Sequence, residues 1–176
     1  MKPLIILFIL LGIACNTPTD KRNNIDELTK VTLPYSGSCK TNLTIYEKDN
    51  ISAVIQKLPG NLMFAGLLKH TEKYSAIILV DTHADYQIPY LTTINNQGEI
   101  IEKFDLYSIG CAEDESSWGQ ANFLIDKDLK IIQTDSSASY KRNENGEIIK
   151  ETINCTSHKL EFYIDKNGKI KKHSNH

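Results

Sequence analysis

The sequence predicts an all-β fold, an antiparallel meander of about eight to ten strands that forms a barrel or a sandwich, with one or two short helices before it. From Leu62 onward, short runs of alternating apolar and polar residues follow one another, and turn-forming residues separate them at close spacing. Two of the turns contain an Asn-Gly pair, Asn145-Gly146 and Asn167-Gly168. Asn-Gly between alternating runs is the strongest short-range signal for a β-hairpin, so neighbouring runs are expected to pair with each other.

The expected strands cover residues 62–70, 74–81, 88–95, 99–107, 121–126, 129–135, 138–142, 147–154, 158–165 and 169–172. Alternation is clearest in 158–165, where Leu160, Phe162 and Ile164 share one face. The run 76–80 does not alternate, which is typical of a central strand covered on both faces. A loose strand-turn-strand pattern recurs near positions 94, 125, 142 and 164. Hairpins in general produce such a pattern, so it does not by itself indicate the repeated blades of a propeller.

The amino-terminal part has a different pattern. Residues 23–30 and 49–58 each begin with Asn or Asp, which are good helix caps, and continue with helix-compatible residues. Two short helices are therefore expected, the second ending at Pro59-Gly60. Residues 31–48 lie between them and have room for one or two strands.

The first fifteen residues have the layout of an exported signal segment. Lys2 supplies a positive charge, Leu4 to Leu11 form an apolar run, and small residues precede Cys15. A run of this length is well short of the ~20 residues that a membrane-spanning helix needs. The protein is therefore expected to be exported.

This layout resembles the signal peptides of bacterial lipoproteins. In that family the cut falls directly before the cysteine, which then carries a thioether-linked diacylglycerol and usually an amide-linked fatty acid such as palmitate. The resemblance implies that residues 1–14 are removed and that lipid is attached to Cys15. One position departs from the family, because Gly12 stands where Leu is usual and Leu11 lies one residue earlier. Gly12 and Ala14 also suit an ordinary signal peptidase, so simple secretion with a free Cys15 thiol is the alternative.

Composition limits the rest of the chain. Residues 15–24 are polar and are expected to form a flexible tether, and residues 25–176 suit a single β-rich domain. The net charge is −2, so no basic surface for nucleic acid is expected. The expected location is the outer membrane or its periplasmic face, with the lipid anchor as the membrane contact.

Cysteine usage agrees with an oxidising compartment. If Cys15 carries lipid, then Cys39, Cys111 and Cys155 remain, so one disulfide and one thiol are expected. The sequence allows every pairing, and Cys111–Cys155 is favoured because both residues end predicted strands. No CxxC motif occurs, so the common redox and zinc motifs are absent from the sequence.

One cluster has the composition of a metal site. Asp81, His83 and Asp85 follow the apolar run 76–80, and on a continued strand their side chains would point the same way. Such a set can ligate a divalent ion. The string faintly resembles the opening DxH motif of calcineurin-like metallophosphoesterases, but the further motifs of that family do not occur. A hairpin loop rich in turn-forming aspartates is the interpretation that the sequence favours.

A second cluster suggests recognition of a partner. Glu113, Asp114 and Glu115 are consecutive and lie close to Trp118, the one tryptophan of the chain. Tryptophan is enriched among the anchoring residues of interfaces. The same residues also suit a solvated loop with Trp118 packed on the edge of the β domain.

Taken together, these features predict a lipid-anchored envelope protein with a non-catalytic β domain that binds a ligand or a protein, as inhibitors, immunity proteins and accessory subunits do. No cofactor is expected. The alternative is a metal-dependent hydrolase that uses Asp81, His83 and Asp85.

Overall fold

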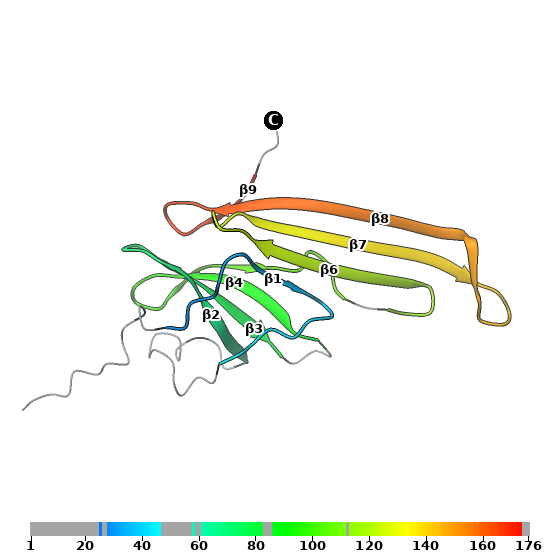
Figure 1. Ribbon diagram of the computed structural model, residues 1–176, viewed down its shortest axis with the longest axis horizontal. Coiled ribbons are helices and arrows are strands. Elements are labelled where there is room, and N and C mark those ends of the chain that lie inside the picture. Colours follow the sequence, from blue (N-terminus) through cyan, green and yellow to red (C-terminus); the bar gives the residue numbers. More distant parts are fainter. Residues whose placement is uncertain are drawn as a thin grey trace, which may run out of the picture.

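The computed structural model describes residues 25, 28–46, 58, 61–82, 86–111 and 113–173. These residues form two antiparallel β-sheets that stack on each other (Figure 1). The all-β prediction is confirmed, and the architecture is the sandwich rather than the barrel.

The four-stranded sheet is a meander in which strands that follow each other along the chain pair in order. Its strands are β2 (Leu62–His70), β3 (Ser75–Asp81), β4 (Ile88–Ile94) and β5 (Ile100–Asp105). The five-stranded sheet has the order β1-β6-β7-β8-β9. Its strands are β1 (Tyr35–Ser38), β6 (Ser117–Ile125), β7 (Ile131–Arg142), β8 (Ile148–Ile164) and β9 (Ile170–Lys172). The whole four-stranded sheet is thus inserted in sequence between β1 and its partner β6.

Apolar side chains cover both faces of the four-stranded sheet. Every residue from Ala76 to Val80 in β3 is at most 1% exposed, which confirms the prediction of a central strand covered on both sides. Ile78 and Val80 belong to the cluster between the two sheets. Ile77 and Leu79 belong to a second cluster on the opposite face, with Ile25, Leu28, Leu58, Leu62, Phe64, Leu67 and Ile94. The amino-terminal segments therefore supply part of the cover of this sheet.

Four hairpin turns share one design. Each begins with an Asn or Asp whose Oδ1 accepts hydrogen bonds of 2.8–3.0 Å from the backbone N–H groups two and four residues later. The fourth residue of each turn has a positive φ, which Gly adopts without strain. The first residues are Asn95, Asp126, Asn143 and Asp165, and the fourth residues are Gly98, Leu129, Gly146 and Gly168. The recurring sequence pattern is therefore a repeated turn, not a repeated domain.

β7 and β8 are each longer than predicted. The predicted strands 129–135 and 138–142 form one strand, and so do 147–154 and 158–165. The hydroxyl-rich residues between them do not make turns, because their side chains bond across the sheet. Ser137 Oγ, for example, lies 2.8 Å from Thr156 Oγ1. β6, β7 and β8 consequently extend beyond the four-stranded sheet as a long arm (Figure 1).

The register between β7 and β8 breaks once along the arm. Ser139 is opposite Asn154, but Lys141 is opposite Ile149, so β8 contains extra residues at this point. The Thr152 hydroxyl accepts a hydrogen bond of 2.8 Å from the Lys141 N–H and so replaces a backbone partner. From Asn154 to Phe162 the ladder between the two strands is regular.

Much of the amino-terminal prediction falls outside the described residues. The predicted segments that lie outside are the signal segment 1–14, the tether 15–24 and the second expected helix, 49–58, apart from Leu58. Of the first expected helix, 23–30, only 25 and 28–30 are described, and Lys30 there forms a β-bridge with Leu67. In the described part of the chain, no helix has the length and apolar character to cross a membrane.

The β8–β9 hairpin holds the two sheets together at one end. The Thr93 hydroxyl donates a buried hydrogen bond of 2.7 Å to the carbonyl of Gly168, in the turn of this hairpin. The Ile170 N–H donates a second, of 3.0 Å, to the Glu102 carboxylate on β5. Gly168 has a φ of +80°, and a Cβ there would lie only 3.0 Å from the Tyr74 ring, so both the backbone conformation and the close approach of this turn favour glycine.

Candidate binding site

The predicted acidic cluster lies in the segment 111–116, called the acidic loop below, whose residues 113–116 form a tight turn that leads into β6. The Asp114 carboxylate accepts hydrogen bonds from the backbone N–H groups of Ser116 (2.7 Å) and Ser117 (2.6 Å) and from the Ser117 hydroxyl (2.9 Å). These hydrogen bonds, the one from the Ser116 N–H first, lower the pKa of Asp114. Asp114 therefore acts as the acceptor that shapes the turn, and its carboxylate is already engaged by the chain.

Glu113 and Trp118 stand on the two sides of this turn and are joined by an isolated antiparallel β-bridge. Trp118 is half-buried, whereas Glu113 and Glu115 are exposed. The backbone carbonyl of Glu115 accepts a hydrogen bond of 2.7 Å from Arg142 Nε, which attaches the loop to the end of β7. The turn thus holds Glu113 and Trp118 next to each other.

Both residues line an open cleft of about 390 Å³. The cleft lies between the turn after β1, the segment before β4, the acidic loop and the first half of β6. Its lining consists of Cys39, Lys40, Tyr86, Cys111, Glu113, Trp118, Gly119 and Gln120. Two of the four residues predicted to bind a partner, Glu113 and Trp118, therefore share a cleft, while Asp114 and Glu115 do not line it.

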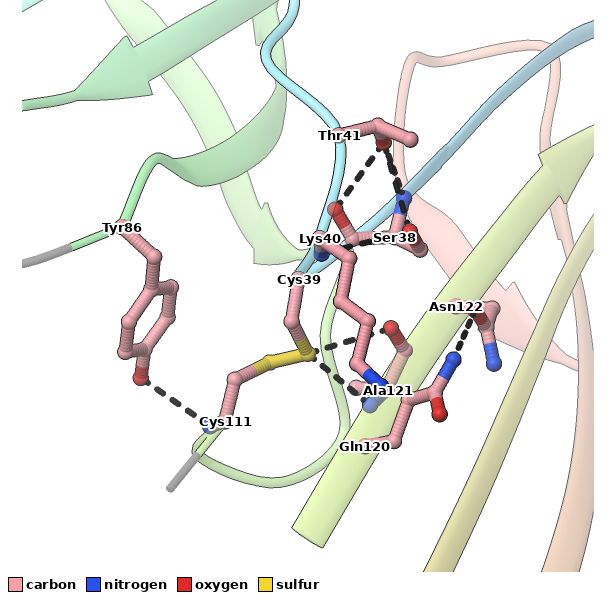
Figure 2. The surroundings of a disulfide bond; sticks show 9 residues. All are labelled: Ser38, Cys39, Lys40, Thr41, Tyr86, Cys111, Gln120, Ala121 and Asn122. Carbon is pink, nitrogen blue, oxygen red and sulfur yellow. Dashed lines mark hydrogen bonds between the residues drawn. A yellow bond between two sulfur atoms is a disulfide. The ribbon is translucent and has the colours of Figure 1, made fainter. Parts of the chain in front are cut away.

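A disulfide between Cys39 and Cys111 forms part of the wall of this cleft (Figure 2). The two Cα atoms are 5.7 Å apart, within the usual range for a disulfide. Cys39 Sγ also accepts a hydrogen bond of 3.0 Å from the Ala121 N–H. The disulfide therefore joins the end of β1 to the acidic loop, and the hydrogen bond from Ala121 attaches both to β6.

The predicted disulfide is present, but the favoured pairing Cys111–Cys155 was wrong. Cys155 is an exposed free thiol in the middle of β8. It lies opposite Ala138 on β8, which β7 separates from β6, whereas Cys39 and Cys111 meet beside β6, where the Ala121 N–H contacts Cys39 Sγ. Cys39 meets Cys111 because β1 pairs with β6, although β2 to β5 lie between these two strands in the sequence. The positions at which predicted strands end do not reveal this long-range contact.

Tyr86 and Gln120 complete opposite sides of the cleft (Figure 2). The Tyr86 hydroxyl accepts a hydrogen bond of 3.2 Å from the Cys111 N–H, which orients the ring beside the disulfide. Gln120 Nε2 donates a long hydrogen bond of 3.4 Å to Asn122 Oδ1. The site thus combines two aromatic rings, an amide and one charge of each sign, from Lys40 and Glu113. Aromatic faces with a few polar groups are typical of recognition sites.

The predicted metal cluster is described only in part. Asp81 is the last residue of β3, and Asn61 Nδ2 lies 3.3 Å from its carboxylate. His83 and Asp85 lie outside the described residues. Among the residues that are described, His, Cys, Asp and Glu side chains form no group of three or more suited to a metal ion.

A buried carboxylate on β7 was missed by sequence reasoning. Asp135 in β7 is 5% exposed, lies 2.9 Å from His158 Nδ1 and accepts a 2.8 Å hydrogen bond from the Ser108 hydroxyl. Burial by itself would raise the pKa of Asp135, but the hydrogen bonds from His158 and Ser108 outweigh burial and lower it. Serine contacts the carboxylate and not the imidazole, so this is not the order of a nucleophilic triad. The alternating pattern of β7 was the available signal, because it places Asp135 on the same face as Ile131.

Comparison with known proteins adds no family to this description. No family model matches the chain, and no curated protein or solved structure matches it.

Proposed function

We propose that this chain is a lipid-anchored cell-envelope protein whose β-sandwich is a non-catalytic binding module, with the cleft beside the Cys39–Cys111 disulfide as its contact with a ligand or protein. The observation that carries the proposal is the composition of this cleft. Trp118 and Tyr86 offer aromatic surface, and Lys40 and Glu113 offer charges of both signs. A covalent bond and a hydrogen-bonded turn hold these groups in place, and such preorganisation lowers the entropic cost of binding.

The fluorescence of Trp118 tests this proposal directly, because the chain contains one tryptophan and it lines the cleft. The purified protein is titrated with soluble envelope extract and then with its separated protein and glycan fractions. We expect one fraction to change the Trp118 emission and to be retained by the immobilised protein. Retention is expected to be lost in Trp118→Ala and reduced in Glu113→Gln.

Tyr163→Ala is the matched control, because Tyr163 is an aromatic residue of β8 that is 43% exposed and lies away from the cleft. This variant is expected to retain the same fraction as the unmodified protein. If no fraction changes the emission, or if Trp118→Ala retains the fraction as well as Tyr163→Ala does, the cleft is not the binding site.

The anchor rests on the sequence around Cys15. Each buried CH₂ of an acyl chain contributes about 0.8 kcal/mol of membrane affinity, so two or three chains hold a domain firmly. Cells fed a clickable fatty acid are expected to label the unmodified protein and not Cys15→Ser, and the variant is expected to leave the membrane fraction. Membrane association that persists in Cys15→Ser would contradict the anchor without affecting the cleft.

A further inference from the structure

A second open cleft, of about 370 Å³, lies next to the candidate binding site. The turn after β1 separates the two clefts, because its residues 39 and 40 line the first cleft and the residues on either side of them line the second. Among the described residues that line the second cleft, none is charged. Its polar side chains are hydroxyls and amides, from Ser36, Ser38, Thr41, Asn42 and Asn122. The two clefts are therefore neighbours that differ in their chemistry.

Strand β6 runs from the first cleft to the second. Trp118 and Gln120 line the first cleft, and Asn122 lines the second. Their spacing of two residues places these side chains on one face of the strand, opposite the face that buries Ala121 and Ile125 in the core. Gln120 Nε2 bonds to Asn122 Oδ1 across the boundary between the clefts (Figure 2). The two clefts therefore form one elongated site along β6.

Several polar groups of this site have hydrogen-bonding capacity that the chain does not use. In the described part of the chain, the side chains of Ser36 and Asn42 make no hydrogen bond. Asn122 accepts the bond from Gln120 through Oδ1, which leaves its Nδ2 as a donor, and Gln120 keeps its Oε1 as an acceptor. All four side chains are exposed or half-buried, so a ligand can reach them. The site thus offers donors and acceptors along its length.

The edge of β6 that faces the first cleft is occupied by the chain itself. The Cys39 N–H donates a hydrogen bond of 3.2 Å to the carbonyl of Ala121. The Asp114 N–H donates one of 2.9 Å to the carbonyl of Ser117, and the isolated β-bridge of the acidic loop lies next to it. An extended peptide therefore cannot add here as a further strand, the mode in which backbone hydrogen bonds supply the affinity. A ligand of this site has to be recognised through side chains.

The charges of the site favour an uncharged ligand. Of the described residues that line the two clefts, Lys40 and Glu113 carry the charges, one of each sign. Because these charges cancel, the lining has no net field that would attract a strongly acidic or a strongly basic chain. The site suits a long, neutral molecule with many hydrogen-bonding groups.

We propose that the ligand is a neutral glycan chain that lies along β6 across both clefts, an inference that rests on the proposed function. In the first cleft, Trp118 and Tyr86 offer aromatic surface to the apolar C–H face of a sugar ring. In the second cleft, amides and hydroxyls bond to the hydroxyls of the following rings, since each sugar hydroxyl both donates and accepts. At about 3.4 Å per residue, the row from Trp118 to Asn122 is about 14 Å long. It extends beyond a single sugar ring, so the ligand is an oligosaccharide.

Chemical treatment of ligand fractions tests this class of ligand. The full chain carrying Cys15→Ser, which removes the proposed lipid, is titrated with the neutral glycan fraction of a soluble envelope extract while the Trp118 emission is followed. We expect the emission to change, and we expect the change to survive protease treatment of the fraction. Periodate cleaves the vicinal diols of sugars, so treatment of the fraction with periodate, which is removed before the titration, is expected to abolish the change.

The contrary outcomes of this test can be told apart. A change that the protein fraction alone produces, and that protease abolishes, would overturn the glycan while leaving the cleft as the binding site. A change that the acidic glycan fraction alone produces would overturn the neutral ligand in the same way. If no fraction changes the emission, the proposed function fails together with this inference.

Chain length tests the role of the second cleft. The active neutral fraction is divided by size into disaccharides and longer chains, and the affinity of Asn122→Ala for each is measured. Loss of this amide is expected to weaken the binding of longer chains about threefold to tenfold, as the loss of one hydrogen bond does. Disaccharides at Trp118 do not reach Asn122, so their affinity is expected to stay the same.

Gln97→Ala is the matched control, because Gln97 is an exposed amide in the turn between β4 and β5 and lines neither cleft. It is expected to bind both size classes as the unmodified protein does. Equal affinity of Asn122→Ala and Gln97→Ala for longer chains would overturn the extension along β6. An equal loss of disaccharide binding in Asn122→Ala would overturn it as well, because Asn122 would then act through the first cleft and not by contact with the ligand.

Discussion

Removal of the Cys39–Cys111 disulfide tests how the end of β1 is held beside the segment that precedes β6. We consider the double variant Cys39→Ala/Cys111→Ala. The bond closes a loop with a sequence separation of 72 residues that contains the whole four-stranded sheet. In the folded protein, β1 has only four residues to pair with β6, so the covalent bond supplements a short ladder.

The expected loss of stability follows from the size of this loop. In the chain-entropy description, closing a loop of 72 residues removes enough entropy from the unfolded chain to stabilise the fold by about 4 kcal/mol at 25 °C. For a chain of this size, a loss of this magnitude lowers the unfolding temperature by roughly 10 °C. The pairing Cys111–Cys155 would close a shorter loop and would leave Cys39 free.

Urea unfolding followed by circular dichroism measures the difference in the free energy of unfolding. Cys155→Ala is the matched control, because Cys155 is an exposed thiol. It is expected to change the free energy by less than about 0.5 kcal/mol. Thiol labelling of the unmodified protein under non-reducing conditions is expected to modify Cys155 and to spare Cys39 and Cys111. A loss below about 1 kcal/mol in the double variant would refute the loop argument, and an equal loss in Cys155→Ala would refute the pairing.

Three further substitutions test the packing. Gly66→Ala is expected to cost about 1–3 kcal/mol in urea unfolding, because Gly66 has a φ of +154° and a Cβ there would collide with the Val31 side chain. Asp135→Asn is expected to cost about 2 kcal/mol at neutral pH by weakening the hydrogen bond with His158. Because the pKa of Asp135 is lowered by folding, its contribution is present above pH 3.8 and is lost as the pH falls through the lower folded value. The two proteins are therefore expected to converge in stability in acid, and a constant difference would contradict this role. Tyr107→Phe is expected to leave thermal stability unchanged or to raise it by up to about 1 kcal/mol, because the buried Tyr107 hydroxyl has no hydrogen-bond partner among the described residues. A clear loss of stability would show that this hydroxyl is bonded.

Local signals in the sequence predicted the local structure well. The turns at Asn145-Gly146 and Asn167-Gly168 form hairpins with positive φ at the glycine, and the run 76–80 is buried on both faces. The division of β7 and β8 into shorter strands was wrong, because serine and threonine are common in turns as well as in strands. Only their hydrogen bonds across the sheet, such as that between Ser137 and Thr156, decide between the two.

Features that depend on distant parts of the chain were predicted less well. Glu113 and Trp118 were identified because they lie close together in sequence. Tyr86, Lys40 and Gln120 were not, because only the packing of separate segments brings them to the same cleft. The disulfide pairing failed for the same reason, since no local pattern shows that β1 belongs to the sheet of β6.

In the sequence, the four-stranded sheet lies between the first and second strands of the five-stranded sheet, and this arrangement favours an order of assembly. A polypeptide that emerges with its amino terminus first exposes β1 long before any strand of its own sheet has been made. β2 to β5 need only their immediate neighbours and can pair at once, since short loops close at low entropic cost. β1 has to wait for β6, which begins six residues after Cys111, so the Cys39–Cys111 bond can hold the end of β1 beside the place where β6 will pair with it. Covalent closure thus prepares the docking of the first strand before the rest of its sheet is complete.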